Sequence, residues 1–287
     1  MKSINLKELE KINLEGWNLT KETPAEMLYQ KGNSEKKVTI FETYSLEENF
    51  KNKKLHGVTI GRMKKPFLHY PNIESRIYLI ENFLEGKKEG IEQRFFEDGS
   101  SVSQEWENDR LHGKWEEWFG NGQKEIEKTY VDGKLNGQQY EWYKNGKLKF
   151  EESFSKGVQT GEKNKFLENG KLKRNQPYKD GKVEGIVYEL WDYKGKLVDG
   201  GLYSETEYQD GVKQGKETVF YPDKTKMREG FNQNGMEHGE RIWWSKSGII
   251  SIKEYYENGE LDGQRFIYNE LGELEMTQLY EKGNRIV

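Results

Sequence analysis

Aromatic residues and glycines recur along this chain with a fixed spacing. In residues 130–143, YVDGKLNGQQYEWY, an aromatic residue precedes a first glycine by three positions. A second glycine follows four positions later, and more aromatic residues come five or six positions after it. The second glycines lie 33, 23, 24, 24, 24, 30, 24 and 24 residues apart, and they are Gly57, Gly90, Gly113, Gly137, Gly161, Gly185, Gly215, Gly239 and Gly263. A period of this size predicts an array of stacked repeats instead of one globular core.

Two turn signals divide each repeat. Asp132-Gly133 and Asn145-Gly146 are dipeptides favoured in two-residue hairpin turns, where positive φ is required. Turns of the two kinds alternate at 13 and 11 residues, which leaves one short strand between successive turns. The pattern predicts an all-β fold, an elongated single-sheet antiparallel meander of β-hairpin repeats with a period of about 24 residues.

The turn positions also predict a register. With the Asn-Gly dipeptide at 145–146 as the turn, Gly137 faces Phe154. The same count gives four more pairs: Gly113 with Tyr130, Gly161 with Tyr178, Gly239 with Tyr256 and Gly263 with Tyr280. We expect the ring to lie over the glycine, because this restores buried area where a side chain is missing. Asn232 interrupts the row of aromatics, and we expect the adjacent Phe231 to substitute for it.

The regular repeats are flanked by less regular segments. We predict an N-terminal cap segment at 1–26, degenerate repeats at 27–82, and regular repeats at 83–287 with an insertion near 196–204. Within the cap, apolar residues among Lys and Glu allow a short helix: Leu6, Leu9 and Ile12. Alternation at 76–83 predicts a strand. The insertion is a candidate contact site, and the alternative is a neutral loop insertion.

Composition and charge exclude several classes of function. The 46 basic and 50 acidic residues are interspersed, with a net charge of -4 and no basic stripe, so we expect no nucleic-acid partner. A membrane partner is disfavoured because no polybasic patch is present in the sequence. The chain has no cysteine, which excludes disulfides and thiolate metal sites. No apolar run is long enough for a signal peptide or a membrane span, and we therefore expect a cytoplasmic protein.

No catalytic motif stands out in the sequence. His56, His112 and His238 each precede a second glycine, where other repeats have various polar residues. We interpret these histidines as solvated turn residues. Nucleophile elbows, phosphate-binding loops and zinc-ligand spacings are absent from the sequence. We therefore predict no catalytic residue, no metal ligand, no cofactor-binding residue and no bound cofactor, in a protein that is not an enzyme.

Four tryptophans are candidates for binding a partner: Trp118, Trp142, Trp191 and Trp244. The predicted register places Trp118, Trp142 and Trp244 on one face of the sheet and Trp191 on the other. Tryptophan is enriched in protein-binding hot spots, so one face is a candidate recognition surface. The other interpretation is that the aromatics of both faces are structural.

At these residues the chain resembles the MORN repeat family, and more closely its bacterial variant form. The motif reads Tyr-x-Asp-Gly-Lys-x-x-Gly followed by Trp-Tyr-x-Asn-Gly, and residues 221–240 approach the original MORN pattern. The resemblance implies an elongated, twisted β-meander. Bacterial proteins built from the variant are often labelled antitoxin-like, whereas original MORN proteins are linked to membranes and scaffolding. It therefore implies a non-catalytic protein that binds another protein, a toxin or effector, as an antitoxin or inhibitor would. The alternative is a structural scaffold or a membrane-associated adaptor.

Overall fold

The computed structural model describes residues 18–23, 26–40, 44–63, 76–191 and 201–286. These residues form strands and hairpin loops, with no helix among them. The chain divides into two compact units, the first with residues 1–137 and 144–146 and the second with residues 138–143 and 147–287.

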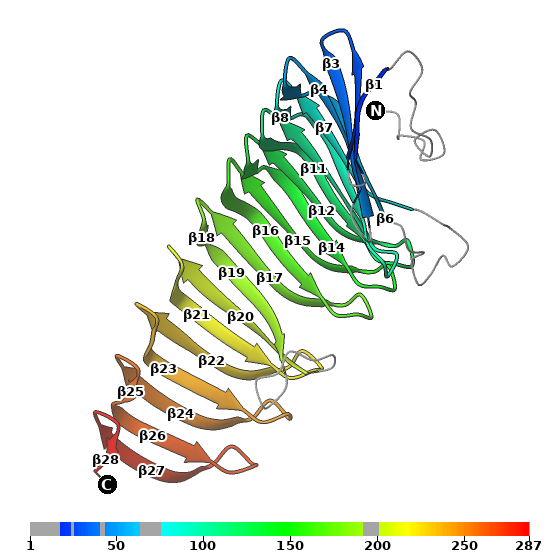
Figure 1. Ribbon diagram of the computed structural model, residues 1–287. Helices are drawn as coiled ribbons and strands as arrows, with labels where there is room; N and C mark the ends of the chain where they lie inside the picture. Colours follow the sequence, from blue (N-terminus) through cyan, green and yellow to red (C-terminus); the bar gives the residue numbers. More distant parts are fainter. Residues whose placement is uncertain (1–17, 24–25, 41–43, 64–75, 192–200, 287) are drawn as a thin grey trace. The chain divides into compact units, whose positions relative to one another are not determined.

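In the first unit, strands that follow one another in the chain pair antiparallel as a meander (Figure 1). These strands are β1 (Asn18–Thr23), β2 (Glu26–Lys31), β3 (Ser34–Ile40), β4 (Tyr44–Lys51), β5 (Lys54–Leu55), β6 (Gly57–Met63), β7 (Arg76–Leu84), β8 (Lys87–Lys88), β9 (Gly90–Phe95), β10 (Ser101–Glu107), β11 (Arg110–Trp118), β12 (Lys124–Val131) and β13 (Lys134–Leu135). Each of these two-residue strands is separated by a single residue from the longer strand that follows it, and the two together form one arm of a hairpin.

The second unit is a meander of the same kind, again antiparallel and in chain order (Figure 1). It takes all of β14 except its first residue. Its strands are β14 (Gly137–Trp142), β15 (Leu148–Ser155), β16 (Val158–Phe166), β17 (Leu172–Lys179), β18 (Lys182–Val183), β19 (Gly185–Trp191), β20 (Leu202–Gln209), β21 (Val212–Phe220), β22 (Lys226–Gln233), β23 (Met236–Trp244), β24 (Ile250–Glu257), β25 (Glu260–Leu261), β26 (Gly263–Tyr268), β27 (Leu274–Glu281) and β28 (Asn284–Arg285). The predicted fold class, an all-β antiparallel meander of hairpins, is confirmed.

The Asp-Gly turns have the geometry that their sequence predicts. Asp132 and Gly133 have φ of 49° and 76°, and Asp180 and Gly181 have φ of 50° and 80°. Positive φ at both central residues is the geometry of a two-residue type I′ hairpin. Glycine and aspartate tolerate this geometry, so the dipeptide determines the turn.

The Asn-Gly loops are one residue longer than predicted. At 119–123 the Gly122 N–H donates to Phe119 O at 2.8 Å, and the Phe119 N–H donates to Gln123 O at 2.9 Å. Only the glycine of this Asn-Gly pair has positive φ, 82°. This is a three-residue loop that ends in a glycine bulge, not a two-residue turn. The register shift next to it, between Glu117 and Trp118, absorbs the extra residue.

The predicted register therefore holds away from the loops. Four glycine–aromatic pairs are confirmed: Gly113 with Tyr130, Gly161 with Tyr178, Gly239 with Tyr256 and Gly263 with Tyr280. The fifth pair, Gly137 with Phe154, stays a prediction.

The reason we gave for the second glycine is wrong. Gly113 has φ of 106°, and a methyl group there would overlap the carboxylate of Glu105 instead of meeting a ring. At Gly239 an added methyl would meet nothing within 4 Å. The glycine is required because it lies in a bulge, where residues 112–114 oppose the single residue Glu105. A positive φ in such a bulge favours glycine over every residue with a side chain.

Apolar burial is limited in both units. The first unit holds a small cluster of Ile60, Ile77 and Ile80, against which Val58 and Phe95 pack. Across the described residues, more polar and charged side chains are buried than apolar ones. The buried side chains of this protein are therefore mostly polar or charged.

Several predicted segments fall at the limits of the described residues. The short helix predicted around Leu6, Leu9 and Ile12 lies outside them, as does the insertion up to residue 200. The strand predicted at 76–83 is confirmed as β7.

Candidate functional site

The two faces of the sheet in the second unit differ in burial. Successive residues of a strand point to opposite faces, so each strand contributes to both. We define the inner face by residues that are at most 8% exposed: Val187, Thr206, Glu217, Arg241 and Glu254. We define the outer face by exposed residues on the other side: Ile186, Glu205, Phe231 and Tyr255.

Ion pairs cross the inner face from strand to strand. The Glu217 carboxylate lies 3.1 Å from Lys213 Nζ and 3.2 Å from Arg228 Nη2. Burial raises the pKa of Glu217, but Arg228 and Lys213 outweigh this effect and hold the pKa below the ordinary 4.5. Burial also lowers the pKa of Arg228, against the opposing effect of Glu217. Each charge is already matched, so this pair has a structural role.

The network continues around Glu254, which is buried. Its carboxylate accepts hydrogen bonds from Trp243 Nε1 at 2.9 Å and from the Tyr256 hydroxyl at 3.1 Å. It also pairs with Arg265 Nε at 3.2 Å. Burial, and then the Glu254 charge, raise the pKa of Tyr256. Arg228 lies 5.3 Å from the centroid of the Trp243 ring and so joins this cluster to the preceding one.

Arg241 pairs with Glu237, which lies opposite Asn232, the residue where the row of aromatics is interrupted. The Arg241 side chain lies over Gly230, where an added methyl would be 3.3 Å from Arg241 Nε. Its guanidinium lies 4.6 Å from the centroid of the Tyr256 ring. The expectation that Phe231 substitutes for the missing ring is wrong, because Phe231 is 53% exposed on the outer face.

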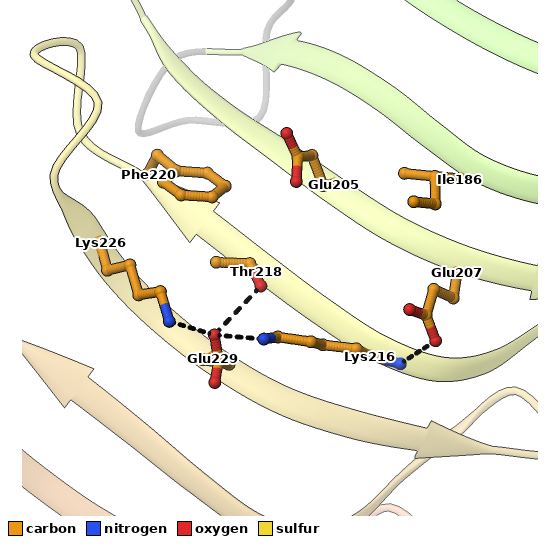
Figure 2. Close-up of a pocket in the computed structure, with 8 residues that line it drawn as sticks. All are labelled: Ile186, Glu205, Glu207, Lys216, Thr218, Phe220, Lys226 and Glu229. Atoms are coloured by element: carbon orange, nitrogen blue, oxygen red, sulfur yellow. Dashed lines mark hydrogen bonds and ion pairs between the residues drawn. The ribbon is translucent and has the colours of Figure 1, made fainter.

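On the outer face, two lysines clamp one glutamate. Lys216 Nζ and Lys226 Nζ lie 2.9 Å and 2.6 Å from Glu229 Oε2, and the Thr218 hydroxyl donates to the same oxygen at 3.4 Å (Figure 2). The first unit repeats this arrangement with Glu127, Lys114 (3.6 Å) and Lys124 (2.5 Å). Each of these lysines thus has a carboxylate as its partner.

A hollow of ≈ 160 Å³ opens beside the Glu229 clamp. Figure 2 shows Glu205 between Phe220 and Ile186 along one side of it. The Tyr203 ring stacks on Phe220 with centroids 4.5 Å apart, and Tyr188 follows at 5.5 Å from Tyr203. Burial, and then the Glu205 charge, raise the pKa of both tyrosines. Within the described residues the Glu205 carboxylate has no hydrogen bond or ion pair of its own.

The four candidate tryptophans are half-buried and have separate surroundings. Trp118 ends β11 in the first unit. Trp142 stacks on Tyr140 with centroids 5.6 Å apart, and Trp244 has a lysine ammonium 5.6 Å from its ring centroid. Trp191 lines a different hollow, of ≈ 360 Å³, on the inner face. Their role in binding a partner stays a prediction.

In five repeats the residue before the second glycine makes a contact that we did not predict. Glu184 accepts a hydrogen bond from the Asp210 N–H at 2.8 Å, and His112 Nδ1 lies 3.5 Å from the Asp132 nitrogen. Three other repeats make the same bond: Glu89 with Asn108 (3.0 Å), Gln214 with Asn234 (2.9 Å) and Asp262 with Lys282 (3.4 Å). The side chain is an acceptor that joins successive turns, not only a solvated turn residue. The signal in the sequence is that every residue at this position carries a side-chain acceptor.

Among the described residues, no group of three or more His, Asp or Glu side chains is placed to hold a metal ion. No helix in this part of the chain is long and apolar enough to cross a membrane.

Comparison with known proteins agrees with the repeat pattern. Four stretches of the chain match the MORN repeat variant. They are residues 111–132, 135–156, 159–180 and 237–258. Each holds two strands and the loop that joins them. No curated protein matches the chain.

MORN repeats are generally protein- or membrane-binding motifs, and their family is non-enzymatic. The match to the MORN repeat variant and the β-hairpin repeats therefore support a binding protein. The match does not extend to an antitoxin-like subtype.

Proposed function

We propose that this chain is a non-catalytic protein that binds another protein through the outer face of its second unit. The observation that carries the proposal is a row of exposed apolar residues on that face. Ile186 and Phe231 are each 53% exposed, and Tyr255 is 39% exposed. Each faces a charged residue on the neighbouring strand: Glu207, Lys216 and Glu240, respectively. Apolar anchors next to charged groups are typical of protein interfaces.

The charges on both faces favour a protein partner. On the inner face, Glu217 and Glu254 are already paired and buried, so this face offers few groups to a ligand. On the outer face, Lys216 and Lys226 are both held by the Glu229 carboxylate, and Glu205 and Glu207 line the same hollow, which leaves no row of free cations for phosphates. Nucleic acid and anionic lipid are therefore poor ligands for this surface.

Within this function we favour an antitoxin- or inhibitor-like role in the cytoplasm, with a toxin or effector protein as the partner. The support is the resemblance of the Asp-Gly and Asn-Gly repeats to the bacterial variant form. A scaffold or membrane adaptor of MORN type is the alternative, and a sequence without a polybasic patch disfavours its membrane version.

The test is capture of the partner on the purified chain with matched variants. The double variant F231S/Y255S removes two exposed anchors, whereas V158S removes an exposed apolar residue elsewhere in the same unit. Circular dichroism first confirms that both fold. We expect one protein, in fixed stoichiometry, to bind the wild type and V158S but not F231S/Y255S. For the inhibitor role, the wild type and not F231S/Y255S should suppress the activity of that protein.

Two outcomes would refute the proposal. One is recovery of nucleic acid or lipid alone. The other is a protein bound equally well by F231S/Y255S. A protein that binds as expected but keeps its full activity in the complex would refute the inhibitor role alone.

A further inference from the structure

Five repeats place a glutamate ten residues before a second glycine: Glu47, Glu127, Glu151, Glu205 and Glu229. Four of them have partners. Glu47 pairs with Lys36 Nζ at 2.8 Å. Glu127 and Glu229 are clamped by lysines, and Glu151 accepts a hydrogen bond from Asn164 Nδ2 at 3.0 Å. Glu205 is exposed, and within the described residues it makes no such contact.

Glu205 differs from the two lysine-clamped glutamates, Glu127 and Glu229, at the positions that supply the lysines. Lys216 and Lys226 clamp Glu229. Lys216 directly follows the preceding second glycine, and Lys226 lies thirteen residues before the following second glycine. Around Glu205 these two positions hold Ile186 and Leu202. Neither side chain carries a charge, and Leu202 is 1% exposed. The carboxylate thus stands at a position that meets a cation in three other repeats and an amide in a fourth, whereas the described residues of this repeat place no cation against it.

The surroundings of Glu205 fit one particular cation. Tyr188, Tyr203 and Phe220 form a stack of rings beside it, with Tyr203 and Phe220 only 10° from parallel. Guanidinium is planar, stacks on aromatic rings and binds a carboxylate through two N–H groups, whereas ammonium does neither as well. The hollow of ≈ 160 Å³ is smaller than the roughly 300–1,000 Å³ of small-molecule sites, so its size suits one side chain.

We propose that the Glu205 hollow receives an arginine side chain of the partner protein. The hollow is lined by three glutamates and two lysines, together with Ile186, Thr218 and Phe220, so its formal charge is negative. The guanidinium pairs with the Glu205 carboxylate and lies against the rings. This inference rests on the proposed function, in which a protein occupies the outer face.

The test uses a short probe, the tripeptide amide acetyl-Gly-Arg-Gly, and its counterpart with neutral citrulline in place of arginine. NMR at low ionic strength follows the backbone amides of Tyr188, Tyr203 and Glu205 in the full chain. We expect saturable shifts with the arginine peptide and an affinity at least fivefold weaker with the citrulline peptide. E205Q should weaken arginine binding at least fivefold, and E151Q, the matched control in another repeat, should leave it within twofold.

I186K supplies the missing lysine from within the chain. The I186K variant should no longer bind the arginine peptide. Its unfolding temperature should equal or exceed that of the wild type, which would show that the loss of binding is not caused by unfolding. Equal binding of the citrulline peptide, or of the arginine peptide to E205Q, would overturn the inference. A partner protein lost in F231S/Y255S but bound unchanged by E205Q would also overturn it and leave the proposed function intact.

Discussion

The bulge at the second glycine makes Gly215→Ala a sharp test of this structure. Gly215 has φ of 102°, and an added methyl would lie 3.2 Å from Glu207 Cδ and closer to one carboxylate oxygen. That carboxylate accepts the Lys216 N–H at 2.8 Å. Alanine must therefore both adopt a strained backbone and displace the Glu207 side chain.

These two effects can be estimated separately. The left-handed backbone costs an L-residue about 1–2 kcal/mol. Losing a hydrogen bond to a charged acceptor costs about 1.5–3 kcal/mol. Gly215→Ala should therefore lower the free energy of unfolding by about 2.5–5 kcal/mol. Gly239→Ala is the control, because Gly239 has φ of 78° and an added methyl would meet nothing within 4 Å. It should cost only the backbone effect, about 1–2 kcal/mol.

The assay is urea unfolding, followed by tryptophan fluorescence and circular dichroism. In a Glu207→Ala background, where the methyl has no carboxylate to displace, Gly215→Ala should cost no more than Gly239→Ala does in the wild type. The account of the bulge fails if Gly215→Ala is no worse than Gly239→Ala. It also fails if the excess cost survives in the Glu207→Ala background.

Three further predictions concern matched polar groups. The folded pKa of Glu217 is held below 4.5, so its stabilisation is present above about pH 4.5 and is lost as the pH falls through the folded value. The melting temperature of the wild type should therefore fall more on acidification than that of Glu217→Gln, and parallel pH profiles would contradict this. Arg241→Ala should cost about 3–5 kcal/mol in urea unfolding, since it leaves an unpaired charge and an unfilled space. Arg241→Lys, which keeps the charge but not the planar contact with Tyr256, should recover only part of the loss, and full recovery would show that charge alone matters. Glu184→Ala should cost about 0.5–1.5 kcal/mol and speed hydrogen exchange of the Asp210 amide, whereas Glu184→Gln should keep that amide protected.

Local chemistry explains which parts of the fold could be predicted. Positive φ at Asp132 and Gly133 follows from the residue types alone, and the spacing of such turns determines which strands pair. The Asn-Gly dipeptide is less specific, because it occurs both in two-residue turns and in three-residue loops that end in a glycine. The pairing of Gly113 with Tyr130 was still predicted correctly, since the bulge next to the loop takes up the extra residue.

The inner face could not be predicted from the sequence. Glu217, Arg241 and Glu254 are among the residue types that are usually exposed, and they become buried only because cations and rings of neighbouring strands meet them. Nothing local to β22 indicates that Arg241 fills the space over Gly230. For the same reason the exposed Phe231 was placed wrongly, and its role on the outer face required the strand register.

The buried ion network also limits how far the repeats are interchangeable. Glu217 is matched by Arg228 of the following strand, and Glu254 by Arg265 of the next hairpin. A repeat moved to another place in the array, or duplicated beside itself, would face a neighbour with a different charge and leave a buried ion alone. Each repeat thus complements the charges of the repeats beside it. The order of the repeats is therefore fixed, although they share one sequence pattern. In this protein new repeats could be added only together with the neighbours that complement them.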